Sequence, residues 1–380
     1  MFISLRNQSV PKLDNNIFLL CGEASGDMHA ANLVKAMKVV QKDVQVVGWG
    51  GRKLELQGVK ILKDLSELSF MGFWEVLMNL KKIRRNFRDC KRDIISQNIK
   101  TLILVDYPGF NLRIAKWAHQ KGIKVIYYIS PQVWAWKRNR VFQIKKYVDV
   151  LYCILPFEAE FYANYNYPVK YFGHPLLDEI VSFKEKQEGK IVKTNKPILA
   201  ILPGSRKQEI EKKLPIMIDA ALAFKESYDI KVACSSHVDF SFYEKFKRNS
   251  ISFVYGETYE LLSVSTMAIV TSGTATLETA LFKVPQVVCY KSSFFSFFIA
   301  KRLIQVKYIS LVNLIMNKKV VTELIQNDCT KNNIIKELKL LQENTETRTT
   351  QIEDYNHLVQ LLGNSGASTR IAEDLMSTLS

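Results

Sequence analysis

The sequence has few of the features that mark secreted, membrane-spanning and metal-binding proteins. Its six cysteines are widely spaced, with no C-x-x-C pair and no histidine cluster beside them. This spacing favours a reduced protein without a zinc site. The first sixteen residues contain no apolar stretch long enough for a signal peptide. No later segment has the roughly eighteen consecutive apolar residues of a spanning helix. We therefore expect a cytoplasmic protein with at most peripheral membrane contact.

Motifs for common cofactors and for metal-bound diphosphates are also missing. The chain has no G-x-G-x-x-G dinucleotide fingerprint, and no lysine follows its glycine-rich turns as in a P-loop. A nicotinamide enzyme is therefore disfavoured. No Asp-x-Asp pair occurs anywhere, so a divalent-cation diphosphate site is not indicated. We expect neither a cofactor nor a bound metal.

The composition describes a large, basic globular protein. The 380 residues are 47% hydrophobic, which is enough for a sizeable core and suggests two domains. A formal net charge of +16 means that the surface attracts anions. Charge alone does not show whether the anionic partner is a nucleic acid, a phosphorylated metabolite or an acidic membrane surface.

Short β-rich apolar runs alternate with longer helical patterns along almost the whole chain. The runs cover residues 17–21, 44–47, 101–105, 125–129, 150–155, 198–202, 230–233, 267–270 and 286–289. Continuous apolar strands separated by helices indicate parallel sheets with both faces covered. The pattern predicts an α/β protein with two doubly wound, Rossmann-like domains facing a central cleft, where ligands bind at the carboxyl ends of strands.

The domain boundaries follow from a change in composition. A polar, lysine-rich stretch at 178–197 interrupts the alternation and is predicted to be an interdomain linker. We expect an N-terminal domain over 1–185, a second domain over 186–345, and C-terminal helices over 346–380.

The turn C-G-E-A-S-G-D-M after the first predicted strand is the first candidate site. Its glycines would let backbone approach a ligand closely, and Glu23 could accept hydrogen bonds from hydroxyl groups. Ser25 or Asp27 would cap the helix that follows. A plain helix-entry turn is the alternative.

Two turns in the second domain suit an anion. In L-P-G-S-R, Ser205 lies at a loop edge beside Arg206, whose planar charged group fits phosphate oxygens. In S-G-T-A-T-L-E, Ser272, Gly273 and Thr274 open a helix whose N-terminus favours negative charge. Glu278 would then lie about one turn inside that helix. Each motif alone is weak, because small hydroxyl residues are ordinary helix caps.

Two further strand ends in the first domain carry candidate residues. Asp106 ends an otherwise apolar strand and would act as a general base, or else cap a helix beginning near Asn111. The next strand leads into S-P-Q-V-W-A-W-K, where Trp134 and Trp136 would line a sugar or acyl pocket or pack against a neighbouring helix.

The motifs together resemble one known family. The segments are G-E-A-S-G-D at 22–27, D-Y-P-G-F-N at 106–111, S-P-Q-V-W-A-W-K at 130–137, F-G-H-P at 172–175, L-P-G-S-R at 202–206 and S-G-T-A-T-L-E at 272–278. In this order they resemble lipid-A-disaccharide synthase over nearly the whole chain. The resemblance implies an inverting GT-B glycosyltransferase. It would join UDP-2,3-diacylglucosamine to 2,3-diacylglucosamine 1-phosphate through a β-1,6 linkage and release UDP.

The resemblance also implies roles for particular residues. The first domain would be the acceptor side, where we assign Asp106, Glu23 and Ser25 as the catalytic set, and the second would bind the UDP-sugar. The implied UDP contacts are Ser205, Arg206, Ser272, Gly273, Thr274, Glu278, Asn313 and Gln326. Gly109 departs from the family, which often has an acidic residue there. The family further suggests a homodimer that exchanges its C-terminal helices.

Two rival functions and a membrane contact complete the expectations. A sugar-nucleotide 2-epimerase of similar fold would need only UDP-GlcNAc. A nucleic-acid-binding protein would use the basic run at 81–92, but no RNP, KH or zinc-finger signature accompanies it. Apolar and basic residues at 70–92 and 294–302 instead match an anionic membrane surface, such as the inner face of the cytoplasmic membrane. Packing of the first stripe on the sheet is the alternative.

Overall fold

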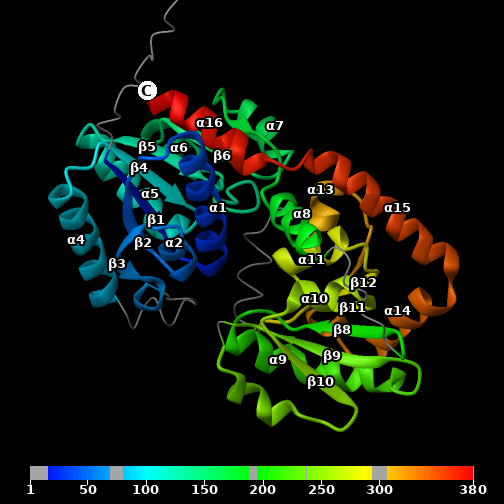
Figure 1. The fold of residues 1–380 in the computed structure, drawn as a ribbon. Helices are drawn as coiled ribbons and strands as arrows, with labels where there is room; N and C mark the ends of the chain where they lie inside the picture. Colours follow the sequence, from blue (N-terminus) through cyan, green and yellow to red (C-terminus); the bar gives the residue numbers. More distant parts are fainter. Residues whose placement is uncertain (1–15, 69–79, 188–194, 237, 293–305, 380) are drawn as a thin grey trace, which may run out of the picture. The chain divides into compact units, whose positions relative to one another are not determined.

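A computed structural model describes residues 16–68, 80–187, 195–236, 238–292 and 306–379. The chain divides into two compact units (Figure 1). Unit 1 consists of Met1–Pro175 together with Ser365–Ser380, and unit 2 is Leu176–Asn364. Each unit is built around its own parallel sheet.

The described strands of unit 1 form one parallel sheet in the order β3-β2-β1-β4-β5-β6-β7. They are β1 (Ile17–Cys21), β2 (Val46–Gly50), β3 (Lys60–Asp64), β4 (Thr101–Val105), β5 (Lys124–Tyr128), β6 (Val150–Cys153) and β7 (Lys170–Tyr171). Every residue of β1 is buried, with Leu19 in the apolar cluster on one face and Phe18 in the cluster on the other. Coverage of both faces explains why the central strands are continuously apolar.

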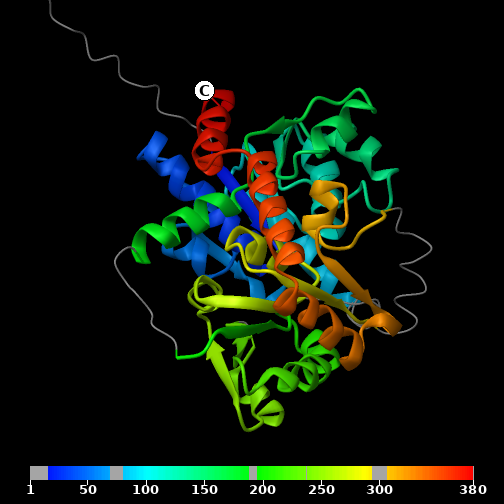
Figure 2. The ribbon, with the colours of Figure 1, turned by 90° about the vertical axis from the view of Figure 1, so that its right-hand side faces the viewer.

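Helices cover both faces of this sheet. They are α1 (Ala24–Val40), α2 (Arg52–Leu56), the 3₁₀ turn η1 (Leu65–Glu67), α4 (Leu80–Ser96), α5 (Pro108–Gln120), α6 (Arg140–Tyr147), α7 (Glu158–Ala163) and α16 (Ala367–Leu379). The apolar cluster on one face includes side chains of α1, α2 and α16, and the other includes α4 to α7. Figure 2 shows α16, in red, beside α1, in blue, so the last helix completes the core of the first unit.

The described strands of unit 2 form a second parallel sheet in the order β10-β9-β8-β11-β12-β13. They are β8 (Ile198–Leu202), β9 (Asp229–Cys234), β10 (Ile251–Tyr255), β11 (Ser265–Thr271), β12 (Gln286–Tyr290) and β13 (Thr322–Ile325). The remaining elements are α8 (Leu176–Gln187), α9 (Lys207–Ala221), η2 (Leu222–Phe224), η3 (Phe240–Phe246), α10 (Thr258–Ser263), α11 (Thr274–Leu281), α13 (Leu311–Met316), η4 (Gln326–Asp328), α14 (Lys331–Glu343) and α15 (Thr345–Leu362).

The predicted fold class is confirmed, whereas the predicted linker and boundaries differ from the structure. Residues 176–187 of the expected linker form α8, because Phe183 packs edge-on against Tyr259 and Phe282 of unit 2. Unit 2 therefore begins at Leu176 and not at residue 186. The expected C-terminal segment is divided, since α15 belongs to unit 2 and α16 to unit 1.

The sequence pattern missed the strands β3, β7, β10 and β13. β3 and β10 are edge strands in which polar residues such as Lys63 and Ser252 interrupt the apolar run. β7 has two residues, which is too short for a recognisable pattern, and two of the four residues of β13, Thr322 and Glu323, are polar.

Candidate active site

The turn between β1 and α1 holds Glu23 and Ser25 at the carboxyl edge of the first sheet. Glu23 directly precedes α1, and Ser25 lies in the first helical turn. The prediction that Ser25 or Asp27 caps α1 is wrong. Asp27 instead accepts hydrogen bonds from the backbone N–H groups of Gly51, at 2.8 Å, and Lys53, at 3.1 Å. Asp27 therefore caps the neighbouring helix α2, whose first N–H groups have no partner within their own helix.

The turn after β4 places Asp106 in a strained backbone conformation. Asp106 and Tyr107 have φ values of +47° and +50°, a left-handed conformation that costs about 1–3 kcal/mol in non-glycine residues. The Asp106 carbonyl accepts hydrogen bonds from Asn111 Nδ2, at 2.7 Å, and from the Tyr127 hydroxyl, at 2.6 Å. The helix begins at Pro108, not near Asn111 as the alternative required. Buried side chains thus hold the turn that presents the carboxyl group.

The β1 and β4 turns lie against each other. The two strands are neighbours, with Cys21 opposite Val105 in the register. The ring of Tyr107 covers Gly22, because a Cβ atom at Gly22 would lie 2.4 Å from its Cδ1. Burial, with a smaller contribution from the Glu23 carboxylate, raises the pKa of Tyr107. The structure thus brings the first two predicted clusters of unit 1 together.

The two tryptophans of the 130–137 loop have different environments. Trp134 is buried and donates its indole N–H to Glu158 Oε1 at 3.2 Å. Trp136 is 38% exposed, with the Lys137 ammonium 4.7 Å and the Arg140 guanidinium 5.3 Å from its ring centre. Packing therefore accounts for Trp134, and Trp136 remains available to line a pocket.

Glu158 is a functional candidate that sequence reasoning missed. Its Oε2 accepts from the backbone N–H groups of Ile154, at 3.2 Å, and Leu155, at 3.0 Å. Burial raises the pKa of this carboxyl to about 7, although its hydrogen bonds favour the charged form. The only sequence signal was an acidic residue soon after a buried strand. Through Trp134, Glu158 fixes the loop that follows β5.

The F-G-H-P motif places His174 beside His29 of α1. The rings of His29 and His174 meet edge to face, with centroids 6.5 Å apart. Burial, and then the neighbouring His29, lowers the pKa of His174 to about 3. The motif therefore contributes a neutral, buried imidazole to unit 1.

The L-P-G-S-R turn follows β8 in unit 2. Gly204 has φ +106°, which favours glycine, and Ser205 is exposed. Arg206 precedes α9 and pairs with Glu209 across 3.3 Å, with half of the arginine side chain exposed. The turn thus presents a partly solvated guanidinium, as predicted from its position.

The S-G-T turn follows β11, the strand next to β8. A Cβ atom at Gly204 would lie 3.5 Å from Thr271 Cγ2, so the two predicted anion turns are neighbours. The Ser272 hydroxyl donates to the Ile309 carbonyl at 2.9 Å, whereas a Cβ atom added at Gly273 would meet open space. Thr274 is exposed at the start of α11. The beginning of this helix is therefore accessible to a ligand.

Glu278 lies one turn inside α11 and is half-buried. Burial, then the charges of Glu278 and of Glu179 on α8, raise the pKa of Tyr259. Glu278 is thus close to the half-buried Tyr259 and is not a fully solvated helix residue.

Asn313, which the family implied as a site residue, is held by hydrogen bonds within unit 2. The side chain is fully buried, and its amide nitrogen donates to Val321 O and Glu323 Oε1, both at 2.9 Å. Its amide oxygen accepts from the N–H groups of Val320, at 2.8 Å, and Val321, at 2.9 Å. Both donors and both acceptor positions are occupied, so Asn313 holds the segment before β13 in place.

Gln326 and Glu323 stabilise the loops around the S-G-T turn. Gln326, with φ +52°, accepts from the Ser292 N–H at 2.8 Å. Glu323, which the sequence did not single out, accepts from the N–H groups of Ile309, at 3.0 Å, and Ser310, at 2.9 Å. The carbonyl of Ile309 is the acceptor of the Ser272 hydroxyl. A network of side chains thus ties the ends of β11, β12 and β13 together.

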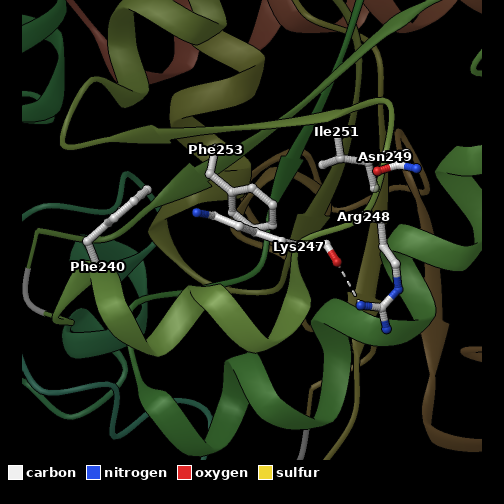
Figure 3. A pocket seen from close by; sticks show the side chains of 6 residues that line it. All are labelled: Phe240, Lys247, Arg248, Asn249, Ile251 and Phe253. Carbon is white, nitrogen blue, oxygen red and sulfur yellow. Dashed lines mark hydrogen bonds between the residues drawn. The ribbon is translucent and has the colours of Figure 1, made fainter.

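A hollow of about 380 Å³ lies elsewhere, beside the edge strand β10 (Figure 3). It contains none of the predicted site residues. Its lining consists of Phe240, Lys247, Arg248, Asn249, Ile251 and Phe253. The described residues contain neither a group of His, Cys, Asp and Glu suited to a metal ion nor a helix long and apolar enough to cross a membrane.

The family model described as lipid-A-disaccharide synthetase matches residues 17–373. The chain belongs to this family. Lipid-A-disaccharide synthase 1 of Legionella pneumophila is 41% identical over 325 residues, covering 83% of this chain and 85% of the relative. Lipid-A-disaccharide synthase of Myxococcus xanthus is 35% identical over 375 residues, covering 96% and 97%. The family resemblance and the UDP-sugar glycosyltransferase class predicted from the motifs are confirmed.

Solved structures outside the lipid-A-disaccharide synthase family share the fold. A putative UDP-N-acetylglucosamine 2-epimerase from Listeria monocytogenes has a TM-score of 0.64 at 14% identity, covering 96% of both chains. The calicheamicin glycosyltransferase CalG4 has a TM-score of 0.61 at 12% identity, covering 96% and 98%. At these identities the similarity concerns the fold alone.

Proposed function

We propose that this protein catalyses the lipid-A-disaccharide synthase reaction with the residues at the two sheet edges. It transfers 2,3-diacylglucosamine from UDP-2,3-diacylglucosamine to 2,3-diacylglucosamine 1-phosphate. The products are the β-1,6-linked disaccharide 1-phosphate of lipid A biosynthesis and UDP. Family membership supports the enzyme class and the pathway.

The acceptor side of the reaction is assigned to unit 1. Asp106 takes the proton from the acceptor hydroxyl while that oxygen forms a bond to the anomeric carbon of the donor. Glu23 and Ser25 hold the acceptor sugar from the adjoining turn. The observation that carries the assignment is the strained Asp106 turn, fixed by Asn111 and Tyr127 and packed against the Glu23 turn. A carboxylate held in a rigid position is a better general base than one on a mobile loop.

The donor side is assigned to unit 2. As the bond between the anomeric carbon and the diphosphate breaks, its electron pair leaves with UDP. Arg206 and Ser205, together with the Ser272-Gly273-Thr274 helix start, stabilise this charge. The exposed positions of Arg206 and Thr274 and the open space at Gly273 support the role. Glu278 accepts hydrogen bonds from the ribose hydroxyls, whereas Asn313 and Gln326 hold the surrounding loops.

The enzyme is further proposed to work at the anionic inner face of the cytoplasmic membrane. The two segments expected to make this contact are 70–92 and 294–302. Residues 70–79 of the first and all of the second lie outside the described residues. In the described part of α4, Phe87 stacks on Phe110 at 4.2 Å, so this part of the apolar stripe packs on its own unit. Three exposed arginines of α4 are proposed to contact the anionic lipids: Arg84, Arg85 and Arg88. Their joint replacement by glutamine should reduce sedimentation with anionic vesicles and leave UDP affinity unchanged.

A homodimer that exchanges α16 also remains a proposal. In one chain, Asp374 of α16 accepts from the Tyr152 hydroxyl and from Lys170, both at 2.6 Å. An exchanged helix would make the same contacts in the other subunit. Light scattering at several protein concentrations tests this assembly.

Product analysis tests the function directly. The protein is incubated with UDP-2,3-diacylglucosamine and 2,3-diacylglucosamine 1-phosphate, and the lipid product is identified by mass spectrometry. We expect a β-linked disaccharide 1-phosphate and one UDP for each linkage formed. Conversion of UDP-GlcNAc to its 2-epimer, without disaccharide formation, would instead assign the epimerase activity.

A further inference from the structure

Lys213 is a buried lysine beneath the L-P-G-S-R turn. It lies on α9, and its side chain is 2% exposed. Its ammonium pairs with Glu209 Oε2 across 3.6 Å. Burial lowers the pKa of Lys213, and the Glu209 carboxylate opposes this shift. A buried ammonium without a counterion is costly, so the two charges depend on each other.

Glu209 serves two cations with its two oxygens. Oε2 is paired with Lys213, and Oε1 is 3.3 Å from Arg206 Nη1. The glutamate also lies against the turn itself, because a Cβ atom at Gly204 would be 3.0 Å from Oε2. The group of three side chains therefore has two positive charges and one negative charge at the edge where the proposed donor binds.

The charge balance of this group depends on Lys213. With Lys213 present, the negative charge of Glu209 is shared between two partners. Without it, Glu209 would have Arg206 as its sole partner in the group, and the pair would have no net charge. The attraction that the turn exerts on a diphosphate would fall accordingly.

We propose that Lys213 is a positioning residue for the donor diphosphate, acting through Glu209. Lys213 offsets the negative charge of Glu209 from within the fold. Glu209 therefore cancels less of the positive charge that Arg206 presents to the ligand. The inference rests on the proposed function, in which Arg206 meets the diphosphate of UDP. The thiols of Cys289 and Cys329 are further titratable groups near the Lys213 ammonium, and both are buried.

Calorimetric titration with UDP tests the proposal, using the full-length protein. Lys213→Met keeps the volume of the side chain but removes its charge, and we expect UDP affinity to fall roughly fivefold to tenfold. Lys212→Met is the matched control, because Lys212 is the exposed neighbour on the same helix. It changes the net charge equally and should alter UDP affinity less than twofold. Binding of uridine, which has no phosphate, should be the same in both variants.

A charge rescue separates the proposed role from a structural one. Removing the glutamate as well, in Lys213→Met/Glu209→Gln, should return UDP affinity to within twofold of that of Glu209→Gln alone. Lys213→Gln provides a second variant if the methionine protein does not fold. Unchanged UDP affinity in folded Lys213 variants, or a loss that Glu209→Gln does not relieve, would overturn the proposal. If the unmodified protein does not bind UDP, the proposed donor site itself fails, which is a different outcome.

Discussion

The ring of Tyr107 lies directly on the backbone of Gly22, at the point where the β1 and β4 turns meet. A Cβ atom at Gly22 would be 2.4 to 2.7 Å from three ring carbons, which no real side chain tolerates. The hydroxyl of Tyr107 donates to the Leu68 carbonyl at 3.3 Å, so the ring is held at both ends. Only glycine at position 22 leaves room for the Tyr107 ring, and the placement of that ring in turn fixes the neighbouring Asp106.

Gly22→Ala should impair catalysis without affecting donor binding. The added methyl group displaces Tyr107 and with it the Asp106 carboxyl, so kcat should fall on the order of 10²-fold. Gly109→Ala is the control, because no atom lies within 4 Å of a Cβ at Gly109. The measurement is steady-state kinetics with UDP titration in parallel. Equal rates for the two alanine variants would show that the close contact does not matter.

Asp106→Asn should reduce kcat by on the order of 10² to 10⁴-fold, the range for loss of a general base. The amide keeps the shape of the side chain and cannot accept the proton at neutral pH. UDP affinity should stay within a few fold, since Asp106 belongs to the unit assigned to the acceptor. A variant that retains most of the wild-type rate would remove Asp106 from the mechanism.

Glu278→Ala should weaken UDP binding by roughly 1.5 to 3 kcal/mol, the range for hydrogen bonds to a charged group. Glu260→Ala, on the exposed surface of α10, is the matched control for the loss of one negative charge. Calorimetry with UDP measures both variants. Removal of a negative charge alone would strengthen the binding of an anion, so tighter binding by Glu278→Ala would exclude the proposed ribose contact.

Treatment with EDTA should leave the activity intact. The chain has no Asp-x-Asp pair, and the proposed diphosphate contacts are Arg206 and the start of α11. These groups supply positive charge without a divalent cation. The measurement is the transfer rate after exhaustive dialysis against EDTA. A loss of activity that magnesium or manganese restores would require a different account of leaving-group stabilisation.

The folded state should lose stability relative to a Glu158→Gln variant as pH rises. The pKa of Glu158 is raised from 4.5 to about 7 in the folded protein, so the folded state holds a proton that the unfolded state releases near pH 4.5. This contribution is complete below about pH 4.5 and is lost as pH rises through about 7. Measured by urea unfolding, the free energy of unfolding of the wild type should fall by up to about 3 kcal/mol relative to that of Glu158→Gln over this window. A difference that does not vary with pH would contradict the raised pKa.

Much of the fold and many of the candidate residues could be predicted from local patterns. Continuous apolar runs such as Ile17–Cys21 indicate buried parallel strands, because side chains on both faces must avoid water. The same runs mark the strand ends, which is where Asp106, Arg206 and Ser272 lie. Edge strands such as β10 were missed, because only part of their surface is buried and their residues do not form an apolar run.

Which side chains face a ligand was decided by contacts between distant segments. The family resemblance made Asn313 a site candidate, and only the structure shows that the N–H groups of Val320 and Val321 donate to its amide oxygen. Lys213 is one lysine in the charged run E-I-E-K-K, and its residue type predicts exposure, although helical spacing places it on the face of Ile210 and Leu214. Folding buries Lys213 and leaves the preceding lysine exposed. Hydrogen-bond partners and the groups that cover a side chain depend on neighbours that are remote in the chain, and local periodicity does not contain that information.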